Sequence, residues 1–267
     1  MPETTAPLKD ASTVVLLRDG EDGLEVFLQH RVKQMAFAGG MTVFPGGGVD
    51  VRDSDVDVSW VGPEPGWWAE RLSTDENLAR ALVAAAVRET FEECGVLLAG
   101  TADAVVPDPS EYADDRRRLE SHELSFAEFL DANGLALRAD LLAPMANWIT
   151  PKPEPRRYDT RFFLAAVPDG QTADGATSEA EATEWRRPAD ALADWDSGRR
   201  FLLPPTWTQL RDLAGHSSVD EALAAPRTVT QIEPDLAAGS GILGIGFDHA
   251  DEYLAALRDG RLEAHRD

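Results

Sequence analysis

Two runs rich in apolar and β-branched residues stand near the start of the chain, at positions 11–17 and 24–31. An acidic segment with two glycines separates them, which is typical of a β-hairpin. Residues 41–44 continue the strand pattern, and it returns at 145–149, 161–167 and 184–186. A late strand is expected at 228–232.

Helical patterns fill much of the remaining chain. An apolar stretch from about 73 to 93 begins with the capping residues Ser73-Thr74-Asp75-Glu76 and ends before Gly95, which suits a left-handed C-cap. Residues 104–138 are helical and charged, clearest at 125–132, and we interpret them as a solvated lid. Residues 188–193 and 206–225 also predict helix. Strands flanked by helices indicate an α+β protein.

The composition restricts the function and the compartment. The chain has 267 residues, 43% of them apolar, and a formal net charge of −23, which disfavours binding to nucleic-acid phosphates. Cys94 is the single cysteine, so no intrachain disulfide forms, and a reducing cytoplasm is the expected location. The longest clean apolar run, 81–87, predicts neither a signal peptide nor a membrane span.

Three glutamates, Glu89, Glu92 and Glu93, stand near the end of the predicted 73–93 helix. At spacings i, i+3 and i+4 they project from one helix face, where like charges repel each other. Hard divalent cations prefer carboxylate oxygens and keep open positions for substrate phosphates. The spacing therefore indicates a Mg²⁺ or Mn²⁺ site for phosphate chemistry.

The residues around these glutamates resemble the Nudix box. Its signature is a Gly, five residues, a Glu, seven residues, Arg-Glu, an aliphatic residue, any residue, Glu-Glu, any residue, Gly and an aliphatic residue. A Phe-Pro-Gly-Gly turn precedes the helix at 44–47, and Thr90 replaces the first aliphatic residue. The second half of the signature is matched at Arg88, Glu89, Glu92, Glu93, Gly95 and Val96.

The two halves of the box are separated here. With Gly47 as the leading glycine, the signature places its Arg fourteen residues later, but Arg88 lies 41 residues later, so about 27 residues are inserted. Counting back from Arg88, the position of the first Glu is occupied by Arg80. The nearby acidic residues that can replace it are Asp50, Asp75 and Glu76, and the sequence does not choose among them.

A split box of this kind is similar to the Nudix branch that contains the peroxisomal coenzyme A diphosphatase. Segments 147–151, 156–163 and 203–206 also resemble that branch.

The resemblance implies an α/β/α sandwich with a mixed sheet, an insertion inside the box and a helical insertion after it. It implies a flexible N-terminus at 1–10, a Nudix domain over 11–200 with insertions at about 50–74 and 104–138, and a C-terminal helical extension at 201–267 packed on that domain. The inserted 50–74 segment is expected to be an ordered or semi-ordered loop whose tryptophans pack on the domain or on a partner.

The activity implied by the resemblance is hydrolysis of a nucleoside diphosphate linked to another group. Coenzyme A or acyl-CoA is the leading substrate, giving 3′,5′-ADP and a phosphopantetheine. Alternatives are ADP-ribose, NADH or dinucleotides, and removal of unwanted nucleoside triphosphates. A different class, a catalytically silent nucleotide-binding regulator, stays open because the first Glu of the box is missing. A homodimer is typical of the family.

Roles for individual residues follow from the same resemblance. Arg88 orients a carboxylate, and Gly46, Gly47 and Gly48 let the backbone approach the helix and the metal site. The general base is a box glutamate or one of Glu179, Glu181 and Glu184. A guanidinium matches phosphate in a bidentate manner, and an aromatic ring can stack on a base, so the candidate substrate-binding residues are Arg31, Arg156, Arg157, Tyr158 and Arg161.

Overall fold

A mixed β-sheet forms the centre of the molecule in the computed structural model, which describes residues 6–32, 38, 40–54, 58–177, 180–236 and 241–258. The strand order is β10-β2-β1-β9-β8-β11, with β3 beside β2 and β4 beside β1. β1 runs parallel to β9, and β8 to β11, while the other pairs are antiparallel. The strands are β1 (Leu8–Gly20), β2 (Gly23–Arg31), β3 (Thr42–Val43), β4 (Gly46–Gly48), β8 (Ala143–Ile149), β9 (Arg157–Ala166), β10 (Ala180–Arg186) and β11 (Gln231–Ile232).

The predicted hairpin at the start of the chain is confirmed as β1 and β2, which pair from Leu17↔Val26 to Gly20↔Gly23. The prediction of a flexible segment over residues 1–10 is wrong for its last residues, because β1 begins at Leu8. Parallel pairing with β9 starts there, at Leu8↔Arg157, and provides the hydrogen bonds that order this end.

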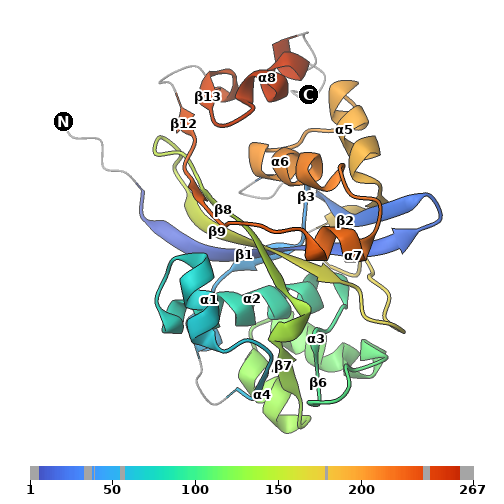
Figure 1. Ribbon diagram of the computed structural model, residues 1–267. Coiled ribbons are helices and arrows are strands. Elements are labelled where there is room, and N and C mark those ends of the chain that lie inside the picture. The colour runs from blue at the N-terminus through green and yellow to red at the C-terminus, as the bar shows by residue number, and fades with distance from the viewer. Residues whose placement is uncertain are drawn as a thin grey trace.

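Helices α1 (Pro65–Leu72), α2 (Glu76–Cys94), α3 (Ala113–Glu120) and α4 (Phe126–Ala132) lie on one face of the sheet (Figure 1). The alternation of side chains along β1 sends Val14 and Leu16 to this face, where they meet apolar residues of α2 such as Leu82 and Val87. These four helices and the sheet therefore share one core.

The opposite face carries α5 (Pro188–Asp196), α6 (Pro204–Leu213), α7 (Val219–Ala224) and α8 (Ala250–Arg258) (Figure 1). Val15 and Leu17 of β1 point to this side and join a second core. Tyr253 of α8 is fully buried there, stacks on Trp195 of α5 and donates to the Leu202 carbonyl at 2.9 Å. The C-terminal part of the chain is thus packed against the sheet.

Helix α2 carries the box residues, and its predicted ends are confirmed. Asp75 is the N-cap and its carboxylate accepts from the Leu78 amide at 2.9 Å. Gly95 is the C-cap at φ 70°, a left-handed conformation that favours glycine. The apolar middle of α2 is buried, so both the caps and the core fix the helix and the direction of its last turns.

The segment at 50–74 is more regular than the predicted loop. It contains a 3₁₀ turn (Val51–Ser54), strand β5 (Trp60–Val61) and helix α1. Pro65 at the helix start and buried Trp68, Ala69 and Leu72 on one face stabilise α1. The tryptophans of this segment pack on the chain's own core.

The interpretation of residues 104–138 as a solvated helical lid is wrong. The segment contains a 3₁₀ turn (Pro109–Tyr112), α3 and α4, but it ends in strand β7 (Ala136–Arg138), which lies between β5 and β6 (Ala99–Gly100) in a small sheet. Phe126, Phe129 and Leu130 of α4 are buried, and Phe129 stacks on Phe91 of α2 at 5.5 Å. These apolar residues make the segment part of the core.

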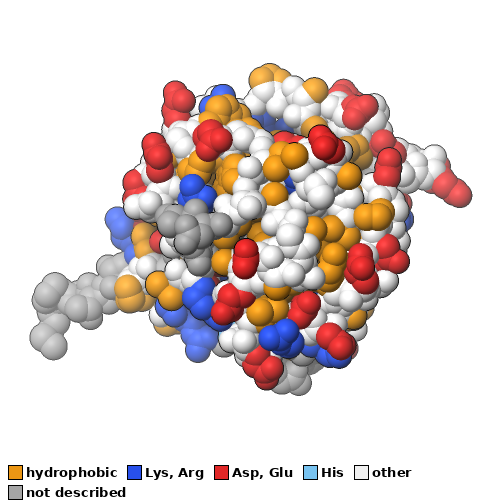
Figure 2. Space-filling view, turned by 90° about the horizontal axis from the view of Figure 1, so that it is seen from below, with side chains coloured by type: hydrophobic (Ala, Val, Ile, Leu, Met, Phe, Trp, Pro, Cys, Tyr) orange, Lys and Arg blue, Asp and Glu red, His pale blue; other side chains and the backbone are white. Residues whose placement is uncertain are grey.

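Short elements complete the chain: two 3₁₀ turns (Ala139–Leu141 and Gly241–Gly244) and the strand pair β12 (Asp235–Leu236) and β13 (Ile245–Gly246). Acidic side chains are scattered over the face seen in Figure 2, in keeping with the net charge. In the described ranges, no helix has both the length and the apolar character needed to cross a bilayer.

Candidate functional site

The last turns of α2 present Arg88, Glu89, Glu92 and Glu93 to one cleft. Arg88, Glu92 and Glu93 are between 5% and 7% exposed, and the Glu89 side chain is 13% exposed. Burial of four charged groups is costly unless each has a partner. The contacts of these four side chains therefore determine the electrostatics of the site.

The glycines of β4 bring the backbone against these carboxylates. The Gly46 amide donates to Glu93 Oε2 at 2.9 Å. A Cβ at Gly47 would lie 2.5 Å from the Glu89 carboxyl carbon, whereas a Cβ at Gly48 would meet nothing within 4 Å. At Gly46 a Cβ would meet the Ser12 carbonyl of β1 at 2.4 Å, so glycine there allows the close approach of β4 to β1, and at Gly47 a side chain would displace the Glu89 carboxylate of α2.

Arg88 contacts most of the other charged residues of the site. Its Nε and Nη2 donate to the two carboxylate oxygens of Asp53, each at 2.9 Å, and Nη2 also donates to the Gly48 carbonyl at 2.9 Å. Its Nη1 donates to Glu89 at 2.8 Å and to Glu92 at 3.2 Å. The guanidinium therefore orients two box glutamates and is anchored by Asp53.

Asp53 is the partner that the sequence analysis missed. Of the three candidates for the missing Glu, Asp50 lines the cleft but pairs with Arg52, Asp75 caps α2, and Glu76 is exposed in the first turn of α2. The signal was present in the spacing, because Asp53 lies six residues after Gly47, where the signature has its first Glu. The inserted residues follow Asp53, so counting back from Arg88 could not find it.

Burial shapes the electrostatics of the carboxylates. It raises the pKa of Glu89 to about 7, although Arg88 opposes the shift. Burial also raises the pKa of Glu92, again against Arg88, and the nearby Glu120 adds to the increase. A raised pKa means that the charged form lacks full compensation, so these groups favour a proton or a cation.

The donor set suits a hard divalent cation, because it consists of carboxylate oxygens. The described residues do not, however, gather three acidic, His or Cys side chains into a ready metal cage. Glu89 and Glu92 face Arg88, and Glu93 faces the Gly46 amide. A cation has the right ligands here, but these side chains must reorient to enclose it.

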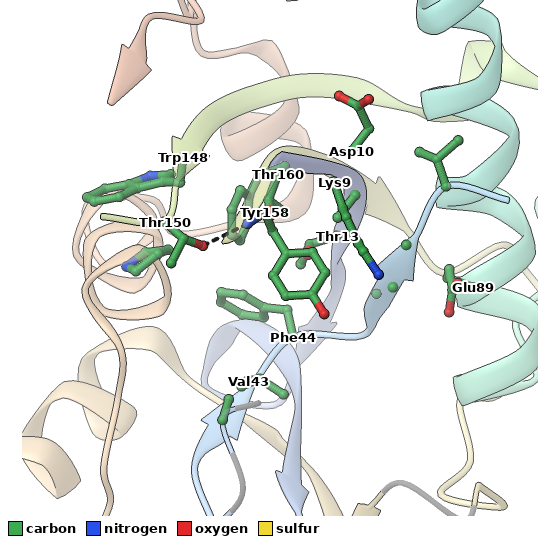
Figure 3. Close-up of a pocket in the computed structure, with 18 of the residues that line it drawn as sticks. Lys9, Asp10, Thr13, Val43, Phe44, Glu89, Trp148, Thr150, Tyr158 and Thr160 are labelled. Atoms are coloured by element: carbon green, nitrogen blue, oxygen red, sulfur yellow. Dashed lines mark hydrogen bonds between the residues drawn. The ribbon is translucent and has the colours of Figure 1, made fainter. Parts of the chain in front are cut away.

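The cleft is open and has a volume of about 1440 Å³. At one end lie the box carboxylates, and the aromatic residues Phe44 and Trp148 line its other part (Figure 3). Segments after α5 add apolar side chains to the lining, namely Leu203, Pro204, Pro205, Leu236, Ile242 and Ile245. The last three pack in the same apolar cluster as Phe44 and Trp148. The indole N–H of Trp148 is buried without a hydrogen-bond partner in the described chain. One cleft thus joins a charged end to an apolar end.

The structure brings three of the five predicted substrate-binding residues to this cleft: Arg31, Arg156 and Tyr158. Arg157 and Arg161 do not line it. Arg157 is buried and donates to the Thr150 carbonyl at 3.0 Å and to Glu233 at 2.6 Å. Arg161 forms an ion pair with Asp159. Arg161 pairs in register with Ser12, whose hydroxyl donates to the Leu82 carbonyl of α2. Arg161 therefore faces the α2 side of the sheet and not the side that Tyr158 faces.

The candidates for a distant general base are not gathered at the cleft. Glu179 lies outside the described residues. Glu181 is exposed on β10, and Glu184 on the same strand pairs with His30 and Arg200. Neither of these two lines the cleft.

Several cleft residues carry no motif that sequence analysis can detect. Lys9 comes from the start of β1, and Glu120 and His122 come from the end of α3 and the turn after it. They are single polar residues in segments far apart in sequence, so only the fold brings them together.

The family model of the NUDT19 Nudix domain matches residues 63–213. Among curated proteins, the acyl-coenzyme A diphosphatase NUDT19 of Gallus gallus is 28% identical over 73% of this chain and 62% of its own length. The Homo sapiens protein of the same name is 27% identical over 75% and 63%. The chain therefore spans slightly less than two thirds of these relatives.

A solved Nudix hydrolase from Alicyclobacillus acidocaldarius has a similar structure. It superposes with a TM-score of 0.71 at 26% sequence identity, covering 84% of this chain and 99% of that one. The match identifies the fold as the Nudix fold, with mixed sheets in an α+β arrangement.

Proposed function

The chain belongs to the NUDT19 Nudix-domain family, and from this membership we propose that it hydrolyses the diphosphate bridge of an acyl-coenzyme A. Water adds to one phosphorus of the bridge, and the bond from that phosphorus to the bridging oxygen breaks. The products are 3′,5′-ADP and an acyl-phosphopantetheine. The relatives that bear the name acyl-coenzyme A diphosphatase support this choice of substrate.

The observation that carries the proposal is the continuity of one cleft from the box carboxylates to the apolar end. Acyl-CoA has the same polarity, with a diphosphate and nucleotide at one end and a thioester-linked chain at the other. The volume of about 1440 Å³ exceeds the ~300–1,000 Å³ of ordinary small-molecule sites. A long ligand with an apolar acyl chain would fill a cleft of this volume.

The proposal includes a divalent cation, Mg²⁺ or Mn²⁺, held by Glu89, Glu92 and Glu93. When bound, it would neutralise phosphate oxygens and lower the pKa of the attacking water. Arg88, anchored on Asp53, keeps Glu89 and Glu92 at the cleft. The Gly46 amide does the same for Glu93.

The proposal also interprets the chain as a Nudix α/β/α sandwich with two insertions. The first lies inside the box, between Asp53 and the helix that carries Arg88, and includes α1. The second, at about 104–138, includes α3 and α4. Helices on both faces of the sheet support this interpretation (Figure 1).

Two alternatives differ in what they predict. A pyrophosphatase for ADP-ribose, NADH or dinucleotides does not need an apolar end that accommodates a long acyl chain. A silent nucleotide-binding regulator predicts ligand binding without phosphate release. The Asp53–Arg88 pair, which occupies the position of the missing Glu, favours an active enzyme over the regulator.

The test is a turnover panel with Mg²⁺ or Mn²⁺ and resolved products. It contains acyl-CoA, coenzyme A, ADP-ribose, NADH, diadenosine polyphosphates and nucleoside triphosphates. We expect acyl-CoA to have the highest kcat/KM, chelation to abolish turnover, and Glu93→Gln to lower it about 100-fold or more. Glu70→Gln, exposed on α1 and outside the cleft, is the matched control and should stay within about twofold.

The opposite results are equally informative. Preference for ADP-ribose or NADH over every acyl-CoA would refute the substrate assignment. No turnover of any compound, with a nucleotide still raising Tm, would support the regulator.

A further inference from the structure

Most arginines of this acidic chain are already paired with a carboxylate. Arg88 directs all its N–H groups to Asp53, Gly48, Glu89 and Glu92. Arg157 and Arg161, predicted to bind substrate, are paired away from the cleft with Glu233 and Asp159. None of these three is available to hold the phosphates of a substrate.

Lys9 differs from these arginines in the part of the chain that the structure describes. It lines the cleft, its side chain is exposed, and neither an ion pair nor a hydrogen bond engages its ammonium group. Arg156 directly precedes β9 and also lines the cleft. It is exposed and has no ion pair within the described ranges. An unpaired ammonium among so many carboxylates is a cation free to meet an anionic ligand.

The fold fixes the direction of the Lys9 side chain. Ser12 of β1 points to α2 and donates to the Leu82 carbonyl at 2.6 Å. Side chains alternate along a strand, so Lys9 and Thr13 point to the other side, into the cleft. Figure 3 shows the Lys9 ammonium extending toward Glu89, with the Tyr158 ring beside it. Tyr158 is its register neighbour on β9.

These observations place the Lys9 ammonium near the carboxylate end of the cleft, where a diphosphate would meet the box. We propose that Lys9 binds a non-bridging phosphate oxygen of the substrate and stabilises the negative charge that develops there during hydrolysis. A lysine suits this role as a compact point charge on a flexible stem. The assignment rests on the proposed diphosphatase function.

The main experiment compares Lys9→Met with Lys152→Met. Lys152 is also an exposed lysine without an ion pair in the described ranges, but it does not line the cleft. With acyl-CoA and Mg²⁺, we expect Lys9→Met to lower kcat/KM about 100-fold and Lys152→Met to change it less than about twofold. Lys9→Arg, which keeps the charge, should recover most of the loss.

A merely structural role predicts a different pattern. Lys9 makes no ion pair with any residue that the structure describes, so Tm of Lys9→Met should equal that of the wild type. Equal kcat/KM for the wild type and Lys9→Met, or equal losses in Lys9→Met and Lys152→Met, would overturn the assignment.

A binding measurement separates this inference from the proposed function. Calorimetric titration with inorganic diphosphate and Mg²⁺ requires no turnover. We expect Lys9→Met to weaken the binding about tenfold or more and Lys152→Met to leave it unchanged. If the wild type hydrolyses nothing yet shows this difference, the proposed function fails and the role of Lys9 stands. Wild-type binding that Lys9→Met does not weaken, or no binding at all, refutes the role of Lys9.

Discussion

The buried pair between Asp53 and Arg88 gives a sharp prediction for Asp53→Ala. The Asp53 side chain is 2% exposed and that of Arg88 is 7% exposed, and two hydrogen bonds of 2.9 Å join them. Removing one partner leaves a buried guanidinium with part of its charge uncompensated, which costs about 3–5 kcal/mol. Glu89 and Glu92 lose their fixed orientation as well, so kcat/KM should fall about 100-fold.

Urea denaturation measures the free energy of unfolding, and acyl-CoA turnover measures the activity. Asp140→Ala is the matched control, because Asp140 also accepts two hydrogen bonds from an arginine, Arg138, but is 34% exposed and lies away from the cleft. It should cost about 1 kcal/mol or less and leave turnover unchanged.

A double variant completes the test of the pair. In Asp53→Ala/Arg88→Met no buried charge remains at this position, so the protein should be more stable than Asp53→Ala alone. Equal losses of stability in Asp53→Ala and Asp140→Ala would refute the reasoning. So would a double variant whose loss is the sum of the two single losses.

Three further predictions concern the rest of the molecule. Gly47→Ala should lower turnover with the fold retained, since its Cβ would lie 2.5 Å from the Glu89 carboxyl carbon and displace that carboxylate, while Gly48→Ala, with open space, should stay active. Burial opposes ionisation of Asp194, but three arginines prevail and hold its pKa below the ordinary 3.8. Its stabilising contribution is therefore present above pH ~4 and lost as the pH falls through the lowered pKa, so Asp194→Asn should lower Tm at pH 7 and lower it progressively less as the pH falls below about 4. Burial raises the pKa of the Cys94 thiol, so a thiol reagent should label it only after denaturation.

Local signals in the sequence were sufficient for the central helix and the first hairpin. Helix α2 has an apolar middle, a capping aspartate and a terminal glycine, and each of these acts within a few residues of the chain. The β1–β2 hairpin has two long apolar runs and a short turn. The three carboxylates of the cleft followed from their helical spacing.

The elements and orientations that the sequence did not predict depend on tertiary packing. Strand β7 has three residues, too few for a periodic pattern, and its pairing partners β5 and β6 lie far away in sequence. Helix α4 looked solvated because its charged residues are visible in sequence, whereas the stacking of Phe129 on Phe91 is not. Arg156 and Arg161 could not be distinguished by residue type, since the difference lies in their tertiary positions. Arg156 precedes β9 and lines the cleft, whereas Arg161 lies within β9 in register with Ser12.

The contact of Asp53 with Arg88 joins two positions 35 residues apart. Loop-closure entropy grows slowly with length, and doubling a flexible loop costs only about 0.6 kcal/mol. Intervening segments of very different length can therefore separate Asp53 from Arg88 at little extra cost in free energy, while the geometry of the pair stays the same. The two halves of the Nudix box in this chain are therefore adjacent in the fold but not in the sequence. A sequence pattern with a fixed interval between the halves would not detect the box.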